Sequence, residues 1–192
     1  IVVSRIDDSP NSITEGSQDV WHRTSEMAHS GSYSWLNGVP SNNGRFRKGI
    51  DNSLITTPID LTSAKTAELS TYFKFNINRS SGAPPDGFRV EITTDNGVTW
   101  MPINLGVRSA WGVSGTGGDD SYEGSNDGNY WTHADSLTRL NLDLSDFSGN
   151  SIRIRFRMIT NNASTYKNYD TDAGFYGFYI DDVIVRGTTI QE

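Results

Sequence analysis

Cysteine is absent from this chain of 192 residues, and long apolar runs are absent too. Without cysteine the chain cannot form disulfide bonds, bind zinc through thiolates or use a thiol nucleophile. The compartment stays open, because many exported microbial proteins also lack cysteine. No apolar run approaches the roughly 20 residues that a membrane-spanning helix needs. We therefore expect no insertion into a membrane.

Positive charge is scarce relative to negative charge. The chain has 16 lysine and arginine residues against 23 aspartate and glutamate residues, which gives a formal net charge of −7. This balance disfavours nucleic acid and anionic lipid as main partners. A net negative charge is compatible with cation binding. It is equally compatible with an acidic surface that only contacts water.

Familiar catalytic motifs are missing as well. There is no His-Glu-x-x-His zinc motif and no Gly-x-Ser-x-Gly nucleophile turn. The three histidines, His22, His29 and His133, show no spacing that indicates a nucleophile and its base. We expect the chain not to be an enzyme.

What the sequence does contain is an alternation of apolar and polar residues with a period of two. It occurs in residues 72–77, 88–93, 140–144 and 152–158. The pattern is typical of half-buried strands that leave one face to solvent. Strands at this spacing predict an all-β fold, namely a two-sheet antiparallel jelly-roll sandwich with long loops and little helix.

Local signals refine this expectation. Asp95-Asn96-Gly97 predicts a tight hairpin turn, because Asn-Gly accepts positive φ readily, and Trp100 beyond it is expected to cap the core. Single helical turns are expected at 63–67 and 145–148. No repeat or linker divides the chain, so we expect one domain over residues 1–192. The start at Ile1 suggests a processed product or a segment of a longer protein.

The last apolar segment contains two adjacent carboxylates. Asp181 and Asp182 stand among the aromatic and β-branched residues of Phe178 to Val185, a strand that we expect to be largely buried. Burying an unpaired charge costs several kcal/mol, so a buried Asp usually meets a cation, a metal or backbone donors. Strand alternation predicts that the two side chains point to opposite faces of the sheet.

Five segments follow one another between Trp21 and Val185. They are Trp21 with His29 to Trp35, Leu54 to Thr62, Val90 to Trp100, Leu142 to Gly149 with the arginine-rich strand after it, and Phe178 to Val185. Together they resemble the jelly-roll module found beside secreted bacterial and archaeal peptidases and in surface adhesins. That group includes the immune-inhibitor-A-type accessory domain, the cleaved-adhesin domains and, more distantly, MAM domains. The resemblance implies a non-catalytic module, often stabilised by calcium, and leaves the ligand open.

A calcium site is expected where the two ends of the chain meet. Calcium binds about 6–8 oxygens, usually from carboxylates and backbone carbonyls. The first and last strands of jelly rolls commonly lie close together, which would bring N-terminal oxygens to the closing strand. The alternative is that the carboxylates accept hydrogen bonds from backbone amides or pair with arginine. The candidate ligands are Asp7, Asp8, Ser30, Ser32, Asp181 and Asp182.

The glycine-rich loop 115–128 is a candidate for a second calcium ion. Its acidic residues are Asp119, Asp120, Glu123 and Asp127. Their spacing is not that of an EF-hand loop, and the alternative is a solvated loop without a metal.

Aromatic residues flank the same loop. Trp111, Tyr122, Tyr130 and Trp131 could bind a ligand, because aromatic faces stack on sugar rings in sandwich-type carbohydrate-binding modules. The alternative is that Trp111 and Trp131 anchor the ends of the loop to the body of the protein.

Two further features complete the candidates. Arg153, Arg155 and Arg157 share one face of a strand, where they can pair with acids such as Glu91 or bind an acidic polymer. Asn78 and Asn162 begin Asn-x-Ser sequons and are candidate glycosylation sites.

These observations predict a non-catalytic, calcium-stabilised module for binding or adhesion, within a larger secreted or cell-surface protein. Its partner would be a protein or a glycan at the cell surface. One alternative is a carbohydrate-binding module that uses the loop aromatics. Another is a structural subunit of a surface layer or filament, which would self-associate.

Overall fold

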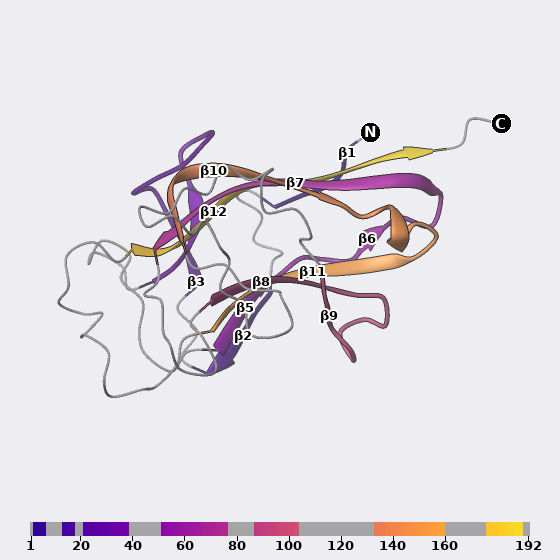
Figure 1. Cartoon of the computed structure of the whole chain (residues 1–192), viewed down its shortest axis with the longest axis horizontal. Helices are drawn as coiled ribbons and strands as arrows, with labels where there is room; N and C mark the ends of the chain where they lie inside the picture. The colour runs from indigo at the N-terminus through magenta and orange to yellow at the C-terminus, as the bar shows by residue number, and fades with distance from the viewer. Residues whose placement is uncertain are drawn as a thin grey trace, which may run out of the picture.

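The computed structural model describes residues 2–6, 13–17, 21–38, 51–76, 87–103, 133–159 and 176–189. Within these ranges the chain forms two antiparallel sheets that lie one above the other (Figure 1). The only helical segment among them is one 3-10 turn, η2 (Ser145–Phe147). The prediction of an all-β, two-sheet antiparallel sandwich with little helix is confirmed.

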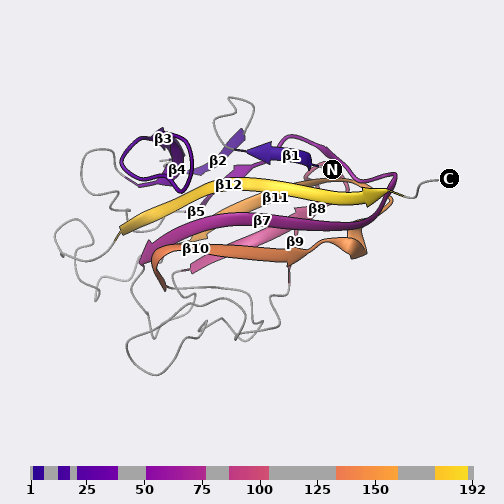
Figure 2. The same cartoon turned by 90° about the horizontal axis from the view of Figure 1, so that it is seen from above.

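The first sheet contains both ends of the described chain. Its order is β10-β7-β12-β4-β3, and β1 also pairs with β12. Because β7 takes one edge of β12, β1 and β4 share the other edge: Ile6 lies opposite Val183, and Trp35 opposite Ile180. Figure 2 shows β1, β12, β7 and β10 side by side. The strands are β1 (Val2–Ile6), β3 (Trp21–Thr24), β4 (Ser34–Asn37), β7 (Ala64–Asn76), β10 (His133–Asp143) and β12 (Tyr176–Thr189).

The second sheet is built around the arginine-rich strand. Its order is β2-β5-β11-β8-β9, with β6 paired to β11. β5 and β6 follow each other along one edge of β11, and β8 takes the other edge. The strands are β2 (Ile13–Ser17), β5 (Asp51–Ile55), β6 (Ile59–Asp60), β8 (Gly87–Thr93), β9 (Met101–Pro102) and β11 (Ser151–Ile159).

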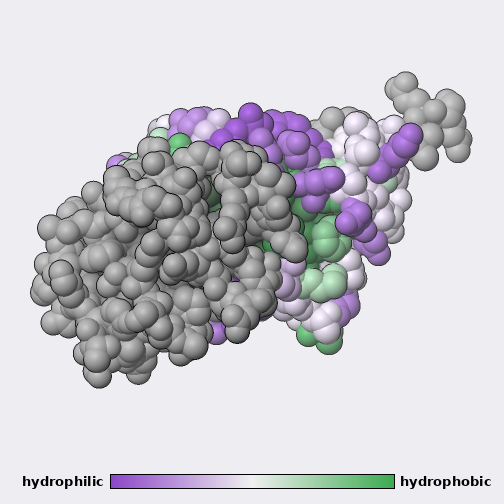
Figure 3. Space-filling model, viewed as in Figure 1, coloured by the Kyte–Doolittle hydropathy of each residue, from purple (hydrophilic) through white to green (hydrophobic). Residues whose placement is uncertain are grey.

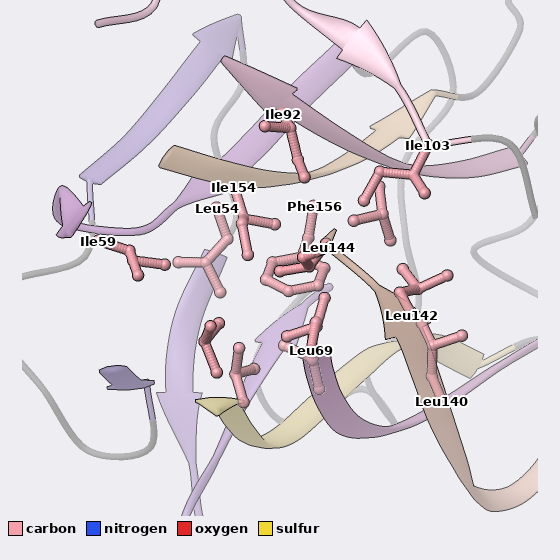
Figure 4. Packing of buried hydrophobic residues seen from close by; sticks show 14 of the residues in the cluster. Leu54, Ile59, Leu69, Ile92, Ile103, Leu140, Leu142, Leu144, Ile154 and Phe156 are labelled. Atoms are coloured by element: carbon pink, nitrogen blue, oxygen red, sulfur yellow. The ribbon is translucent and has the colours of Figure 1, made fainter. Parts of the chain in front are cut away.

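The core lies between the two sheets and follows the alternation in the sequence. Ile152, Ile154, Phe156 and Met158 are buried, while the arginines between them are only partly buried. Leucines of β10 face them from the first sheet, and Figure 4 shows Leu140, Leu142, Phe156 and Ile154 within one packed cluster. The period-two prediction for these strands is confirmed.

Local predictions were partly right. The hairpin turn is confirmed by positive φ at Asn96 (60°) and Gly97 (98°), and the turn near 145–148 is the 3-10 segment η2. The helical turn at 63–67 is wrong: β7 begins at Ala64, because this stretch pairs with Gly187 to Thr189 of β12. Trp100 does not cap the core either, since it lies outside the buried cluster and is partly exposed.

On the face seen in Figure 3, the described part of the surface separates polar from apolar residues. In the space-filling view, hydrophilic residues lie along the outside of the upper layer, and hydrophobic residues show between the two layers (Figure 3). No helix in the described residues has the length and apolar character needed to cross a membrane.

Candidate functional site

The two carboxylates of β12 lie at an irregularity of the strand. Asp181 is 2% exposed and Asp182 is 8% exposed, so both are buried as predicted. The pairing of β12 with β7 shifts register between Asp181 and Ile184, and Asp182 has a φ of +48°. An extra residue of this kind forms a β-bulge, which changes the direction of the following side chain. This bulge sets the geometry of the site.

The turn between β3 and β4 supplies hydrogen-bond donors to Asp181. The backbone N–H groups of His29 and Ser30 donate to Oδ2 of Asp181, over 2.6 Å and 3.2 Å. The other oxygen, Oδ1, accepts the N–H of Asp182 over 2.8 Å. Gly31 follows with a φ of +65°, a conformation that glycine adopts without strain. Three amides therefore stabilise the charge of this buried carboxylate.

Side chains of the same turn reach Asp182. Nδ1 of His29 donates to Oδ2 of Asp182 over 2.8 Å, and the hydroxyl of Ser30 donates to Oδ1 over 2.5 Å. The imidazole of His29 also stacks on the ring of Tyr72, with 3.4 Å between ring centroids. The turn thus covers both carboxylates and the β7 residue that lies opposite Asp181.

The expectation that Asp181 and Asp182 point to opposite faces is wrong. Both accept hydrogen bonds from the turn at residues 29 and 30. Alternation requires regular extended backbone, and the left-handed conformation of Asp182 interrupts it. Nothing in the sequence around Asp182 signals the bulge, because the shift depends on how β7 pairs with β12.

A second contact fixes the same turn. The hydroxyl of Tyr179 donates to Oε2 of Glu26 over 3.0 Å. Burial and the Glu26 carboxylate together raise the pKa of Tyr179 well above its usual range. Ser34 also holds the turn, because its hydroxyl donates to the carbonyl of Met27 over 2.6 Å.

The predicted calcium ligands are only partly brought together. Ser30 lies against the carboxylate pair, whereas Ser32 is exposed and makes no hydrogen bond to either aspartate. Asp7 and Asp8 fall outside the described residues; β1 ends at Ile6, opposite Val183. In the described ranges, no group of three or more His, Asp or Glu side chains could hold a metal ion. An ion here would need oxygens beyond these side chains.

A second polar cluster lies on the outer face of the other sheet. Glu91 of β8 is 2% exposed, and its carboxylate accepts a 2.5 Å hydrogen bond from Nε of Arg155. Arg89 and Arg157 approach the same carboxylate within 3.8 Å and 3.6 Å. Arg157 also makes a bidentate pair with Asp51, over 2.7 Å for each bond. The predicted pairing of the arginine strand with Glu91 is present.

Trp100 adds an aromatic ring to this cluster. The guanidinium carbon of Arg155 lies 4.4 Å from the centroid of the Trp100 ring, a cation–π geometry. The ring remains partly exposed. From its sequence context, this tryptophan was expected to cap the core. The alternation that places Arg155 on the outer face of β11 was the available signal for a partner on that face.

Several predicted residues lie outside the described ranges. They are the acidic loop residues Asp119, Asp120, Glu123 and Asp127, the aromatic residues Trp111, Tyr122, Tyr130 and Trp131, and the sequon residues Asn78 and Asn162. These assignments stay predictions.

Comparison with known proteins identifies the fold. No protein-family model and no curated protein matches the sequence. Solved structures do match. One is a xylan-binding domain of carbohydrate-binding module family 22, formerly called the x6b domain, with a TM-score of 0.51, 12% identity, and coverage of 98% of this chain and 97% of that chain.

Two further structures match equally well. The CBM22-1 xylan-binding domain of Paenibacillus barcinonensis Xyn10C has a TM-score of 0.51 and 14% identity, and covers 100% of this chain and 97% of its own. The K1 cleaved-adhesin domain of Lys-gingipain from Porphyromonas gingivalis has a TM-score of 0.51 and 12% identity, with coverage of 97% and 95%. The fold is thus the jelly-roll sandwich that both carbohydrate-binding modules and a cleaved-adhesin domain use.

Proposed function

We propose that this chain is a non-catalytic glycan-binding module of a secreted or cell-surface protein. The observation that carries the proposal is the partly exposed Trp100 beside Arg155 and Glu91, on the outer face of a jelly-roll sheet. The fold shared with xylan-binding domains supports it. The proposal adopts the carbohydrate-binding alternative over the broader expectation of a calcium-stabilised binding or adhesion module with a protein or glycan partner.

The chemistry of the cluster suits a sugar. A pyranose ring presents an apolar face that packs on an indole, and its hydroxyl groups need hydrogen-bond partners around the rim. Arg155 is held in place by Glu91 on one side and Trp100 on the other. Such fixed polar groups lose little conformational entropy when a ligand binds. The loop residues Trp111 and Trp131 remain candidates for additional contacts.

Binding to a panel of soluble polysaccharides, followed by calorimetry on the best ligand, tests the proposal. Trp100→Ala should weaken the affinity about tenfold, equivalent to about 1.4 kcal/mol. Val98→Ala is the matched control, because Val98 is 83% exposed in the same hairpin. Trp111→Ala and Trp131→Ala, made in parallel, show whether the loop aromatics contribute to the affinity in addition to the sheet face. A panel with no saturable binding would contradict the proposal.

A structural calcium ion is a second proposal, favoured by the burial of two adjacent carboxylates. Asp181, Asp182 and the Ser30 hydroxyl converge under one turn, and β1 ends beside them. Backbone carbonyls, with Asp7 or Asp8, would complete the oxygen set. The ion would compete with the donors of His29 and Ser30 for the same carboxylate oxygens. Its role would be stability, because it would bind only the folded chain.

Self-association in a layer or filament stays a prediction. It differs from glycan binding in requiring only copies of this chain. Sedimentation velocity over a range of concentrations tests for self-association. A chain that stays monomeric at all concentrations would contradict assembly by this chain alone.

A further inference from the structure

The outer face of β11 concentrates positive charge in an otherwise acidic chain. Arg89, Arg155 and Arg157 gather there with the carboxylates of Glu91 and Asp51. Arg153 shares the face by strand alternation, two residues before Arg155 on β11. The chain as a whole carries a net charge of −7. This face is therefore the place where an anionic group would be attracted.

Arg153 differs from the other three arginines. It makes no ion pair in the described part of the chain, whereas each of the other three approaches the Glu91 carboxylate. The Nε of Arg153 is also buried without a hydrogen-bond partner. A buried donor left without a partner is unfavourable, so a ligand oxygen that reaches this guanidinium gains a hydrogen bond at little cost. Arg89, Arg155 and Arg157 all approach Glu91, so Arg153 is the guanidinium of this face that pairs with no carboxylate of the described residues.

Strand register and the turn hydrogen bonds place Arg153 and Trp100 at the same hairpin. Arg153 lies directly opposite Thr93 on β8. The hydroxyl of Thr93 accepts the N–H of Gly97 over 2.9 Å, and Gly97 lies against the indole of Trp100. Arg155 lies two residues from Arg153 on the same face of β11, and its guanidinium stacks on the Trp100 ring. Arg153 and Trp100 thus both lie beside the hairpin that joins β8 to β9.

We propose that this face binds an acidic sugar, a uronic acid residue whose carboxylate is held by Arg153 while its ring packs on Trp100. The inference rests on the proposed glycan-binding function and narrows its ligand class. Guanidinium groups match carboxylates in shape, because two parallel N–H groups meet two oxygens. Partial burial of the arginines strengthens this attraction relative to water.

Calorimetry with three ligands tests the proposal: an oligogalacturonate, the same oligomer as its methyl ester, and neutral xylan. The wild type should bind the free acid at least about tenfold more tightly than the ester, in which a methyl group neutralises each carboxylate. That preference should weaken as salt is raised. Equal affinity for acid and ester would overturn the proposal.

Variants at Arg153 assign the effect to this residue. Arg153→Gln should remove most of the preference for the acid, and Arg153→Lys should restore part of it. Arg186→Gln is the matched control, because Arg186 is exposed on the other sheet and its loss changes the net charge equally. A loss of the same size in Arg153→Gln and Arg186→Gln would refute a specific site.

Different results would contradict the acidic-sugar ligand class and the glycan-binding function. If neutral xylan and the ester bind as well as the acid, the module binds glycans and the acidic-sugar inference is wrong. If none of the three ligands binds and the polysaccharide panel is also negative, the glycan-binding function itself is wrong.

Discussion

Nδ1 of His29 lies 2.8 Å from Oδ2 of Asp182, although 153 positions separate the two residues in the chain. The contact fastens the turn between β3 and β4 onto the bulge of the last strand. Ser30 makes the adjacent bond to the same carboxylate. The buried charge is thus balanced by donors from a single turn, whether or not a cation also binds there.

Ser30→Ala should destabilise the fold, because it leaves Oδ1 of Asp182 without its hydroxyl donor. A hydrogen bond to a charged group contributes about 1.5–3 kcal/mol. Ser32→Ala removes a hydroxyl from the same turn that does not contact the carboxylates, and it should change stability by less than about 0.5 kcal/mol. Urea unfolding of the two variants measures the difference. Equal stabilities would show that the Ser30 contact contributes nothing.

Calcium should raise the melting temperature if the proposed ion binds at the carboxylate pair. At a free concentration one hundred times the dissociation constant, the gain is about 2.7 kcal/mol. The gain should disappear with EGTA and in Asp181→Asn. Calorimetric melting with and without each reagent provides the measurement, and a curve that EGTA leaves unchanged argues against a structural ion.

Removal of the Glu91 carboxylate should cost more than removal of the Asp51 carboxylate. The side chain of Glu91 is 3% exposed and that of Asp51 is 51% exposed, although both pair with arginine. Breaking a buried pair costs roughly 3–5 kcal/mol, because the remaining charge is left uncompensated, whereas an exposed pair contributes about 0–1 kcal/mol. Glu91→Gln and Asp51→Asn, compared by urea unfolding, test this order. A larger effect at Asp51 would contradict the burial argument.

The hairpin between β8 and β9 should lose stability in acid. The hydroxyls of Thr93 and Thr99 and the Thr99 amide donate to Asp95, and they hold the pKa of Asp95 well below its usual range. With a lower pKa in the folded state, the stabilisation is complete above the unfolded pKa, about 3.9, and declines as pH falls below it. Asp95→Asn should therefore flatten the stability profile between about pH 5 and pH 2. A profile that Asp95→Asn leaves unchanged would assign the acid sensitivity to other carboxylates.

The sequence by itself determined the layers of the fold. Alternation in 152–158 and 140–144 places every second side chain between the sheets, because side chains of a strand point to opposite faces in turn. Asn96-Gly97 likewise fixed its hairpin through positive φ. These properties are local, and a strand retains them wherever it pairs. The burial of Asp181 and Asp182 followed from their apolar neighbours for the same reason.

The tertiary structure alone decided what those buried groups contact. The shift between β7 and β12 turned Asp182 toward the same side as Asp181, against the alternation in the sequence. Pairing also converted the expected helical turn at 63–67 into the start of β7, and it placed Trp100 against Arg155 and not in the core. A local pattern records how apolar a position is. The partner of a polar group depends on register and on segments far away in the chain, and these exist only in the assembled sheets.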